Sequence, residues 1–335
     1  MSSRKIVSTK ATAFAPASIG NVGVGFDILG LAIDGVGDTV ELTTTPDSNT
    51  ITISFDNDDG FHTPTIPVDP KKNTAGAALL TMQEDLHLPF GFKIKIKKGI
   101  PLGSGMGGSA ASAVAAVVAA AKIARTASGG TGVHRHIAKL TREQLFSYAL
   151  EGERIAAGVA HPDNVAPSLY GGLTLSSPLF ADQVKAVPLP RGLFCALVHP
   201  DVRVETKLAR QILRPDVGLQ SFVYQSALIA GFVLGCSNGD FELIGESLRD
   251  LVIEPQRQHL IPAFENVKRA AYSVRGCLGF SISGSGPSVF ALSRSQPVAK
   301  KIAQEISAQF RLAGTTSQAY ISRVPARGAH LVKPK

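Results

Sequence analysis

The sequence predicts an α+β protein built from two domains. Its 335 residues are enough for two domains of ordinary size, about 100–200 residues each. Strand patterns and helix patterns occur in both halves, and no fixed-period repeat is present. The composition changes over residues 176–192 (SSPLFADQVKAVPLPRG), where we place the boundary. We therefore expect an N-terminal domain over 1–180 and a C-terminal domain over 190–330.

Two short strands are expected first. Residues 40–45 and 51–55 are rich in β-branched side chains, which favour extended structure. The polar residues 46–49 (PDSN) between them are typical of a tight turn. The sequence therefore predicts a hairpin over 40–55.

A helix and a further strand follow. Residues 73–86 have the apolar spacing of a helix, and Asn73 stands at the position of an N-cap. In residues 91–98 three apolar side chains alternate with lysines, and they are Phe92, Ile94 and Ile96. This alternation predicts a strand with one face in solvent.

The next segment is a glycine-rich turn that opens into an apolar helix. Residues 101–125 read PLGSGMGGSAASAVAAVVAAAKIAR, and the helical part is apolar nearly all round, which predicts a central, buried helix. Residues 126–142 are typical of an exposed loop. A second helix is expected from Thr141 to Ala157, where Thr141 and Gln144 have the spacing of a capping box.

The C-terminal half alternates strands and helices, as expected for a mixed domain. Strands are predicted at 193–198, 279–283, 288–292 and 317–323. Helices are predicted at 205–213, 219–235, 240–252, 262–274 and 297–311.

The composition argues against several classes of protein. Hydrophobic residues make up 44% and charged residues 18%, which suits a globular core and not a disordered chain. The longest apolar run, 113–121, is far shorter than the ~20 residues that span a bilayer. Residues 1–18 lack the apolar stretch of a secretory signal. We therefore expect no membrane association.

The cysteines fit a reducing compartment. Cys195, Cys236 and Cys277 are odd in number, widely spaced and form no CxxC pair. This pattern argues against a disulfide framework and against a zinc site. The expected location is the cytoplasm.

Basic residues gather in one stretch of a chain whose net charge is +8. No acidic residue lies between Asp85 and Glu143, whereas the same stretch holds Lys93, Lys95, Lys97, Lys98, Lys122, Arg125, Arg135, Lys139 and Arg142. Such a field suits a polyanion, although an uneven basic surface would give the same count. No interleaved aromatic residues or known binding module accompany the charges, so nucleic acid is not the expected partner.

The glycine-rich turn is the most informative segment. Glycines let a ligand approach the backbone closely, and the helix behind them presents unpaired N–H groups and its positive dipole end. Together these features predict a phosphate site. We assign to nucleotide binding Asn73, Pro101, Leu102, Gly103, Ser104, Gly105, Met106, Gly107, Gly108, Ser109, Ala110, Ala111 and Ser112.

Two other phosphate-binding motifs do not fit this turn. A Walker P-loop needs G-x-x-x-x-G-K-[ST], and no lysine stands there. Gly103, Gly105 and Gly108 match G-x-G-x-x-G, but a dinucleotide fold also needs an acidic residue ~20 positions later, which is absent. A purely structural turn remains the alternative.

Three ordered motifs resemble the GHMP kinase superfamily. Residues 101–112 resemble its phosphate loop, 15–27 (APASIGNVGVGFD) its first motif, and 279–288 (GFSISGSGPS) its third. The resemblance runs from about residue 12 to 292. It implies an N-terminal ribosomal-protein-S5-like nucleotide domain, a C-terminal ferredoxin-like α/β sandwich, ATP as co-substrate and Mg²⁺.

Four segments resemble the homoserine kinases within that superfamily, namely 21–30, 161–172, 199–210 and 254–262. This resemblance implies ATP-dependent phosphorylation of the side-chain hydroxyl of L-homoserine to O-phospho-L-homoserine, a step of threonine biosynthesis. Another GHMP alcohol kinase and a non-catalytic GHMP-fold ligand sensor are the alternatives. A homodimer is compatible with the sequence, which does not decide the oligomeric state.

The same resemblance implies a substrate site. Arg210 and Arg257 would bind the carboxylate of homoserine, because guanidinium groups pair with it bidentately. Asp27 would accept the ammonium group, and Asn21, His161 and Asn164 would lie near the hydroxyl. Each of these residues could instead be a surface, turn or cap residue.

The resemblance also implies the catalytic roles. Glu153, with Ser109, would be the magnesium ligand, whereas Glu151 faces elsewhere on the same helix. Asn164 stands where mevalonate kinase and galactokinase have an aspartate base, so no general base is expected. Phosphoryl transfer tolerates this, since positioning and charge stabilisation carry most of the catalysis. One departure is Gly108, where homoserine kinases usually have a serine, and this leaves the choice of Ser109 open.

Overall fold

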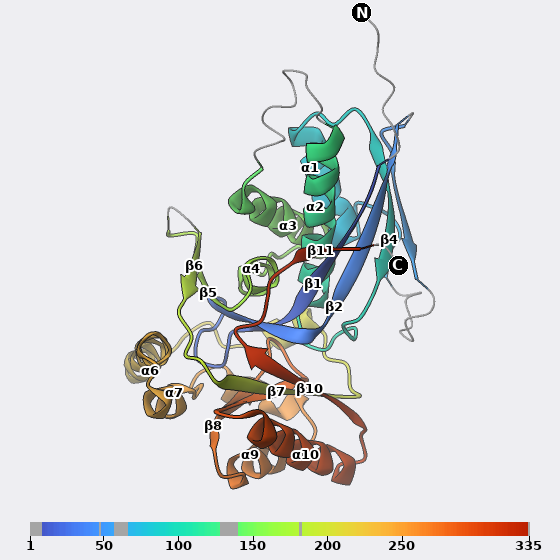
Figure 1. Cartoon of the computed structure of the whole chain (residues 1–335). Helices are drawn as coiled ribbons and strands as arrows, with labels where there is room; N and C mark the ends of the chain where they lie inside the picture. Colours follow the sequence, from blue (N-terminus) through green and yellow to red (C-terminus); the bar gives the residue numbers. More distant parts are fainter. Residues whose placement is uncertain (1–8, 47, 57–65, 128–139, 181–182, 334–335) are drawn as a thin grey trace, which may run out of the picture.

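The computed structural model describes residues 9–46, 48–56, 66–127, 140–180 and 183–333. Within these ranges the strands form two sheets, and helices cover one face of each (Figure 1). The predicted loop over 126–142 falls mostly outside the described residues.

The first sheet has seven strands in the described part of the chain, in the order β11-β1-β2-β4-β3, with β5 on β2 and β6 on β5. These strands are β1 (Lys10–Gly20), β2 (Leu29–Thr45), β3 (Ile51–Phe55), β4 (Gly91–Lys97), β5 (Leu173–Ser176), β6 (Val184–Val187) and β11 (His330–Val332). Only β3 and β4 run parallel; the other described pairs are antiparallel.

The predicted hairpin over 40–55 is wrong, because β4 lies between β2 and β3. Ile94 of β4 is paired with Leu42 on one side and with Ile53 on the other. A turn signal fixes where the chain reverses, but not which strand becomes the neighbour. β4 buries three large apolar side chains and therefore takes an interior position in the sheet.

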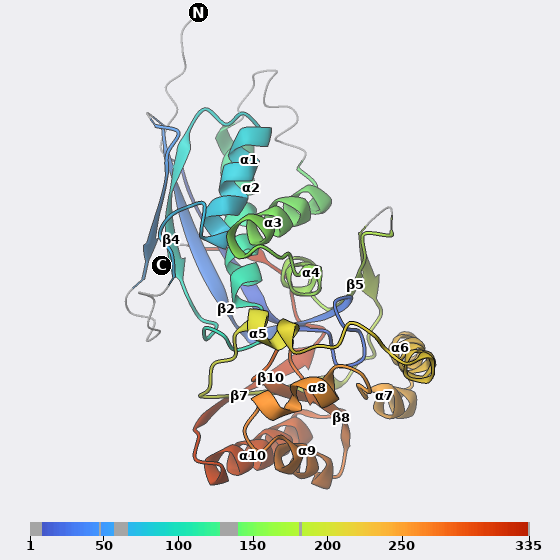
Figure 2. The ribbon, with the colours of Figure 1, turned by 180° about the vertical axis from the view of Figure 1, so that it is seen from behind.

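In the described part of the chain, three helices pack on one face of the first sheet, and a fourth packs on those three (Figure 2). The three are α1 (Thr74–Asp85), α2 (Gly108–Ala127) and α4 (Pro162–Tyr170), and the fourth is α3 (Arg142–Ala157). The predicted caps are confirmed: Asn73 accepts hydrogen bonds from the first turn of α1, and Thr141 with Gln144 forms a capping box on α3. α2 is buried among β1, β2, α1 and α3, as its all-round apolar pattern predicts.

Among the residues that the structure describes, the second sheet has four antiparallel strands in the order β10-β7-β9-β8. They are β7 (Leu193–Pro200), β8 (Cys277–Ile282), β9 (Val289–Ser293) and β10 (Ser317–Val324). Two helices pack on it around a separate core that includes Phe264, Phe280 and Phe310: α9 (Phe264–Ser273) and α10 (Gln296–Leu312). The strands and helices predicted for this half are confirmed, with ends shifted by a few residues.

The remaining helices lie beside the junction of the two sheets (Figure 2). They are α5 (Thr206–Gln211), α6 (Leu219–Asn238), α7 (Phe241–Ser247), α8 (Glu254–Arg257) and a 3₁₀ helix over Gln258–Leu260. The sheets also touch directly, where the backbone N–H of Asp34 donates to Ser322 Oγ at 2.9 Å. After β10 the chain returns to the first sheet as β11, and the domain bounds 1–180 and 190–330 stay a prediction.

Among the described residues, two helical segments are long and apolar enough to cross a membrane, by length and composition alone: Gly108–Thr126 and Leu219–Asn238. Neither segment is an unbroken apolar run, because small polar residues interrupt both and Lys122 and Arg125 lie in the first. The first segment is the buried core helix α2. The second lies at the surface as α6.

Candidate active site

A cavity of about 330 Å³ opens where the two sheets meet. The three segments that hold the sequence motifs all contribute to its walls, and backbone hydrogen bonds join these segments. Ser18 N donates to Met106 O at 3.1 Å, and Gly284 N donates to Gly20 O at 3.1 Å. The motifs are far apart in the sequence and form one continuous lining in the fold.

Nearly every predicted site residue lines this cavity. The exceptions are Ala110 and Ala111, which are buried in the first turn of α2. Predicted residues in the lining are Asn21, Asp27, Asn73, Pro101, Leu102, Gly103, Ser104, Gly105, Met106, Gly107, Gly108, Ser109, Ser112, Glu153, His161, Asn164, Arg210 and Arg257.

The glycine-rich turn depends on glycine at two positions in particular. Gly105 (φ 73°) lies so close to the third motif that a Cβ there would be 2.5 Å from the carbonyl oxygen of Gly286. Gly107 (φ 68°) lies so close to the first motif that a Cβ would be 2.1 Å from Ser18 Oγ. Both contacts exclude any side chain, and the amino end of α2 stays open to the cavity, as an anion site requires.

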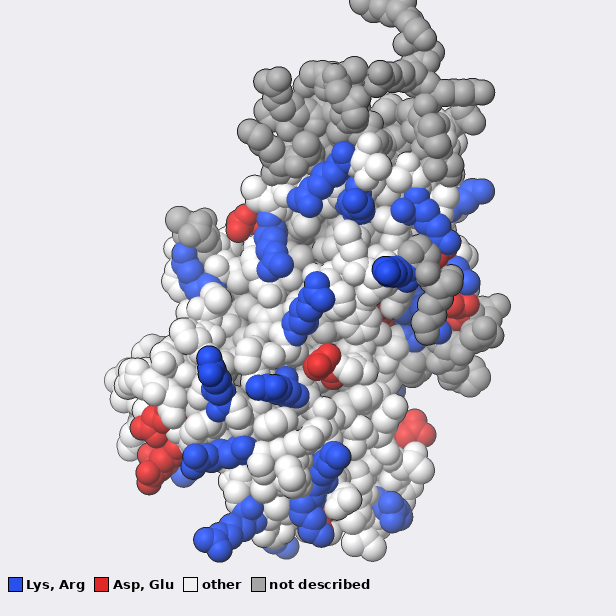
Figure 3. Space-filling model, viewed as in Figure 1, with Lys and Arg blue, Asp and Glu red and all other residues white. Residues whose placement is uncertain are grey.

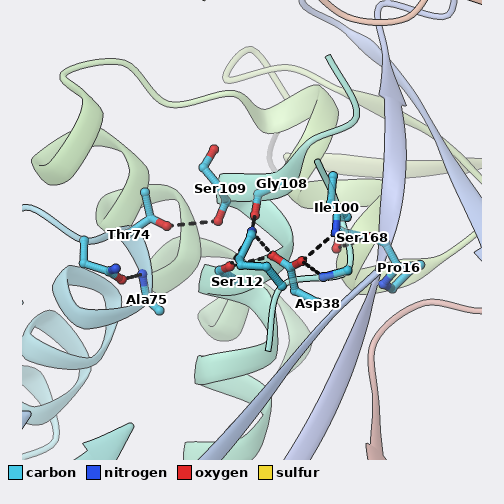
Figure 4. A network of polar contacts seen from close by, with 12 residues as sticks. Pro16, Asp38, Thr74, Ala75, Ile100, Gly108, Ser109, Ser112 and Ser168 are labelled. Carbon is cyan, nitrogen blue, oxygen red and sulfur yellow. Dashed lines mark hydrogen bonds and ion pairs between the residues drawn. The ribbon is translucent and has the colours of Figure 1, made fainter. Parts of the chain in front are cut away.

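A buried network of hydrogen bonds, which includes one ion pair, holds the glycine-rich turn in place (Figure 4). Lys98 Nζ donates to Gly108 O at 2.9 Å, to Ser112 Oγ at 3.0 Å and to Asp38 Oδ2. Asp38 Oδ1 accepts from the backbone N–H groups of Gly99 (3.0 Å) and Ile100 (3.2 Å). The Ser112 hydroxyl donates to Asp38 at 2.6 Å, so it is held in this network below the loop.

Sequence reasoning missed Asp38 and counted Lys98 only as part of the basic stretch. Both side chains are almost fully buried. The sequence contained a sign that Lys98 is buried. Apolar residues alternate with lysines over 92–97, and Lys98 stands where this alternation predicts an apolar, buried residue.

Ser109 and Glu153, the predicted metal ligands, are in contact. The Ser109 hydroxyl donates to Glu153 Oε1, and the fully buried Glu153 also accepts from His161 N at 3.2 Å. Its Oε2 lies 3.4 Å from His161 Nδ1, and this interaction is the main cause that raises the pKa of His161. Glu151 instead pairs with Arg154 at the surface.

No group of three or more His, Cys, Asp and Glu side chains that could hold a metal ion occurs in the ranges that the structure describes. A magnesium ion bound to nucleotide needs fewer protein ligands, since phosphate oxygens and waters supply the rest. The hydroxyl of Ser109 and the carboxylate of Glu153 fit this requirement.

Asn164 is held by a chain of side-chain contacts. Its Oδ1 accepts from Ser18 Oγ at 2.9 Å, and its Nδ2 lies 3.3 Å from Asp163 Oδ1. The other oxygen of Asp163 accepts from Asn21 N at 3.0 Å. Asp163 is buried in the cavity wall, and this burial raises its pKa from 3.8 to about 6.

Asp163 was not predicted as a site residue. Its position directly before Asn164, within 161–172, was the available signal. An aspartate after a proline in a loop is more often a cap or turn residue, and this concealed it.

The predicted substrate residues meet at the other end of the cavity. Arg210 donates to both carboxylate oxygens of Asp27, with Nη1 at 3.1 Å from Oδ1. Phe26 lies near both arginines, with its ring centre 5.5 Å from the guanidinium of Arg210 and 5.3 Å from that of Arg257. Arg257 is buried and donates to the carbonyl oxygens of Ala209 (2.9 Å) and Gly284 (3.2 Å). Desolvation lowers the pKa of Arg257.

The two predicted asparagines Asn21 and Asn73 use their amides to hold backbone. Asn21 Oδ1 accepts from Asp27 N at 3.0 Å, and its Nδ2 donates to Gly284 O at 2.8 Å. Asn73 caps α1 and donates to Pro67 O at 2.9 Å. Direct ligand contacts by these two side chains stay predictions.

Five polar residues of the lining were not predicted, besides Asp163 and Lys98. They are Lys72, Thr74, Arg203, Thr206 and Ser285. Arg203 lies against the glycine-rich turn, where a Cβ on Gly103 would be 2.4 Å from its Cγ. It adds a positive charge beside the loop.

Comparisons with known proteins agree with this geometry. Residues 73–172 match the GHMP kinases N terminal domain, and residues 228–312 match the GHMP kinases C terminal domain. A homoserine kinase of Xylella fastidiosa is 43% identical over 325 residues, which cover 96% of this chain and 94% of the relative. The crystal structure of homoserine kinase from Cytophaga hutchinsonii superposes with a TM-score of 0.87 at 40% identity, covering 99% of both chains. Mevalonate kinase of L. major shares the fold, with a TM-score of 0.66, 17% identity and coverage of 97% and 100%.

Proposed function

The chain belongs to the GHMP kinase family, and from that premise we propose that it transfers the γ-phosphoryl group of ATP to the side-chain hydroxyl of L-homoserine. The product is O-phospho-L-homoserine, a precursor of threonine. The observation that carries the proposal is the cavity, because it joins a glycine-rich phosphate loop to a cluster of one carboxylate and two guanidinium groups. Near full-length identity of 41–43% to homoserine kinases supports the choice of substrate.

The cluster suits an amino acid. Arg210 and Asp27 form an ion pair in the cavity wall. Homoserine carries one negative and one positive charge on its α-carbon, so it replaces this pair by taking one partner with each charge. The carboxylate binds Arg210 and Arg257, and the ammonium group binds Asp27. The hydroxyl then extends toward Asn164, between the substrate cluster and the glycine-rich turn.

The phosphates of ATP lie against the glycine-rich turn and the amino end of α2. Ser109 and Glu153 would hold a magnesium ion, which supplies charge neutralisation on the β- and γ-phosphates when bound. Arg203 adds positive charge at the same turn. Lys98 and Asp38 keep the backbone of the turn in place from below.

No side chain needs to act as a general base. Asn164 orients the hydroxyl oxygen of homoserine, which attacks the γ-phosphorus while the bond to the bridging oxygen breaks. The proton leaves late, to a phosphate oxygen or to solvent, because the transition state is loose. Both oxygens of Asp163 lie against Asn164 Nδ2 and Asn21 N, so this carboxylate positions the amide.

A coupled assay of ADP release tests the proposal. Homoserine, mevalonate, galactose and shikimate are offered at equal concentration with ATP and magnesium, and phosphorus NMR identifies the product. Homoserine should be turned over far faster than the other three. Turnover with another alcohol, or with none, would refute the assignment.

A further inference from the structure

Helix α8 is attached to the second sheet at both of its ends. At its start, Glu254 Oε2 accepts from Ser281 Oγ of β8 at 2.8 Å. At its end, Arg257 Nη1 donates to the carbonyl oxygen of Gly284, just beyond β8, at 3.2 Å. Glu254 and Arg257 are three positions apart, so their side chains leave the same side of the helix. A helix of four residues does not hold its shape alone, and these contacts therefore fix the position of Arg257.

Glu254 is a buried carboxylate, and its counter-charge comes from another helix. In the part of the chain that the structure describes, the cation paired with it is Lys268 of α9, whose Nζ donates to Oε1 at 2.5 Å. Glu254 is only 4% exposed, whereas the lysine and arginine side chains seen in Figure 3 lie at the surface. Burial raises the pKa of Glu254, and the hydrogen bond from Lys268 acts against this. Lys268 therefore helps to keep this carboxylate ionised.

Arg257 has the opposite problem, a buried cation without a counter-charge. Among the described residues, no carboxylate forms an ion pair with it, and its guanidinium donates to the carbonyl oxygens of Ala209 and Gly284. Asp27 of the same cluster is paired with Arg210. A buried guanidinium in this state gains most from a ligand carboxylate, because the ligand supplies the missing charge.

The two charges on α8 are close enough in the sequence to neutralise each other. A glutamate and an arginine three residues apart on one helix can form an ion pair. Such a pair would occupy the guanidinium of Arg257, and the carboxylate of a substrate would have to displace it. The structure shows another arrangement, because Lys268 and Ser281 bind both oxygens of Glu254 while Arg257 contacts backbone.

We propose that Lys268 is a positioning residue for substrate recognition, which binds Glu254 and so keeps Arg257 free for the carboxylate of the substrate. This inference rests on the proposed function, in which Arg257 binds the carboxylate of homoserine. Lys268 is not in the lining of the active-site cavity; with Glu254 it lines a second cavity of about 320 Å³. A substitution of Lys268 therefore changes the charges around α8 and removes no group from the substrate cluster.

Steady-state kinetics of the full chain tests the proposal. Lys268→Met frees Glu254 to pair with Arg257, so it should raise the KM for homoserine about tenfold, the scale of one charged hydrogen bond. The KM for ATP should change little. So should kcat/KM for the amino alcohol that lacks the carboxylate, because this substrate does not use Arg257. Lys301→Met is the matched control, since Lys301 pairs with Glu305 at the surface of α10 at 2.6 Å, and it should leave the KM for homoserine unchanged.

The double variant Glu254→Gln/Lys268→Met separates the effect of charge from that of anchoring. It removes both charges of the ion pair and leaves no carboxylate to occupy Arg257, so the KM for homoserine should return toward that of the wild type. The double variant also covers the case in which Lys268→Met fails to fold, because it leaves no unpaired buried charge. Circular dichroism melting checks that each variant is folded.

Three results would overturn the proposal when the wild type phosphorylates homoserine normally. They are an unchanged KM for homoserine in folded Lys268→Met, an equal loss with the amino alcohol, and a double variant whose KM stays as high as that of Lys268→Met. The last result would make the pair of Lys268 and Glu254 a structural anchor of α8 alone. A wild type that does not phosphorylate homoserine would refute the proposed function itself, and this inference with it.

Discussion

Arg210 and Asp27 form an ion pair at the proposed substrate end of the cavity. The α-carboxylate and the ammonium group of an amino-acid substrate would bind these two opposite charges. If Arg210 binds the carboxylate, Arg210→Leu should weaken homoserine binding about tenfold or more, since a charged hydrogen bond contributes roughly 1.5–3 kcal/mol. The affinity for ATP should change little. Steady-state kinetics with each substrate varied in turn measures both effects.

The amino alcohol that lacks the carboxylate supplies the control for Arg210. It should be a poor substrate of the wild type, and Arg210→Leu should discriminate against it much less. A direct contact requires this coupling, because each change removes one half of the same interaction. Equal losses with both alcohols would make Arg210 structural or phosphate-facing.

Glu153 and Glu151 both lie on α3, so a substitution of Glu151 is a control for the same substitution of Glu153. Glu153→Ala should lower kcat at least ~10²-fold, since it removes a group that helps to stabilise developing charge. Nucleotide should still bind, as fluorescence titration with a labelled ATP analogue would show. Glu151→Ala should have near-normal turnover, because Glu151 pairs with Arg154 at the surface. A reversed order of the two variants would exchange their roles.

Asp163 should make the stability of the protein depend on pH. Its pKa is raised from 3.8 to about 6 by burial, so the folded state holds the proton more tightly than the unfolded state. The resulting stability is present below pH 4 and is lost as pH rises through about 6. Relative to Asp163→Asn, the wild type should lose roughly 3 kcal/mol of unfolding free energy across that window. Urea unfolding at several pH values measures the difference, and parallel curves for the two proteins would contradict it.

At the scale of elements, local signals located the helices and tertiary contacts decided the strands. Asn73 and the pair Thr141 and Gln144 marked helix starts because caps are made within a few residues. The hairpin over 40–55 failed because strand pairing depends on segments far apart in the chain. β1 was missed for a related reason: nearly every residue in it is buried, and polar residues alternate with apolar ones only over Lys10–Ala13.

The residues of the candidate site also fall into two groups, those inside sequence motifs and those outside them. Residues inside motifs could be assigned from the sequence, since each motif is local. Three site residues lie outside the glycine-rich turn in the sequence and reach it only in the folded protein: Asp38 on β2, Asp163 on α4 and Arg203 in the segment before α5. A pattern within one segment of the sequence cannot predict such long-range contacts.

The buried network around Lys98 joins Asp38 of β2 to Gly108 at the start of α2, and a substitution of Lys98 tests its role. Lys98→Met leaves Asp38 buried without its cation, and breaking such a pair costs about 3–5 kcal/mol of stability. The KM for ATP should rise more than the KM for homoserine, because Lys98 also holds the carbonyl of Gly108. Thermal unfolding and kinetics measure the two effects.

Two further variants test this account of Lys98. Lys97→Met, at the exposed neighbouring position, should be nearly neutral. The double variant Asp38→Asn/Lys98→Met should be more stable than Lys98→Met alone, since no unpaired charge is left. If the double variant is worse than the single one, the pair does not act as described.

At the scale of the whole molecule, β11 ties the end of the chain to its beginning. Thr12 of β1 is paired with Val332, and Phe14 with His330. Without β11, β1 would be an exposed sheet edge, and the polypeptide after β10 would keep fewer backbone pairs with the first sheet. A chain that ends at Gly328 should therefore unfold at a lower temperature in calorimetry, with a broader transition, than one that lacks only residues 334–335. An unchanged, sharp transition would show that β11 is dispensable.

The pairing of β1 with β11 also has a consequence for synthesis. β1 leaves the ribosome early, but the partner for its outer edge is made some 320 residues later. Throughout elongation the nascent chain therefore carries an unpaired strand edge, next to the scaffold of the phosphate loop. Such an edge is a template for wrong pairing with other chains. The edge is covered only once β11 has been made and has paired with β1.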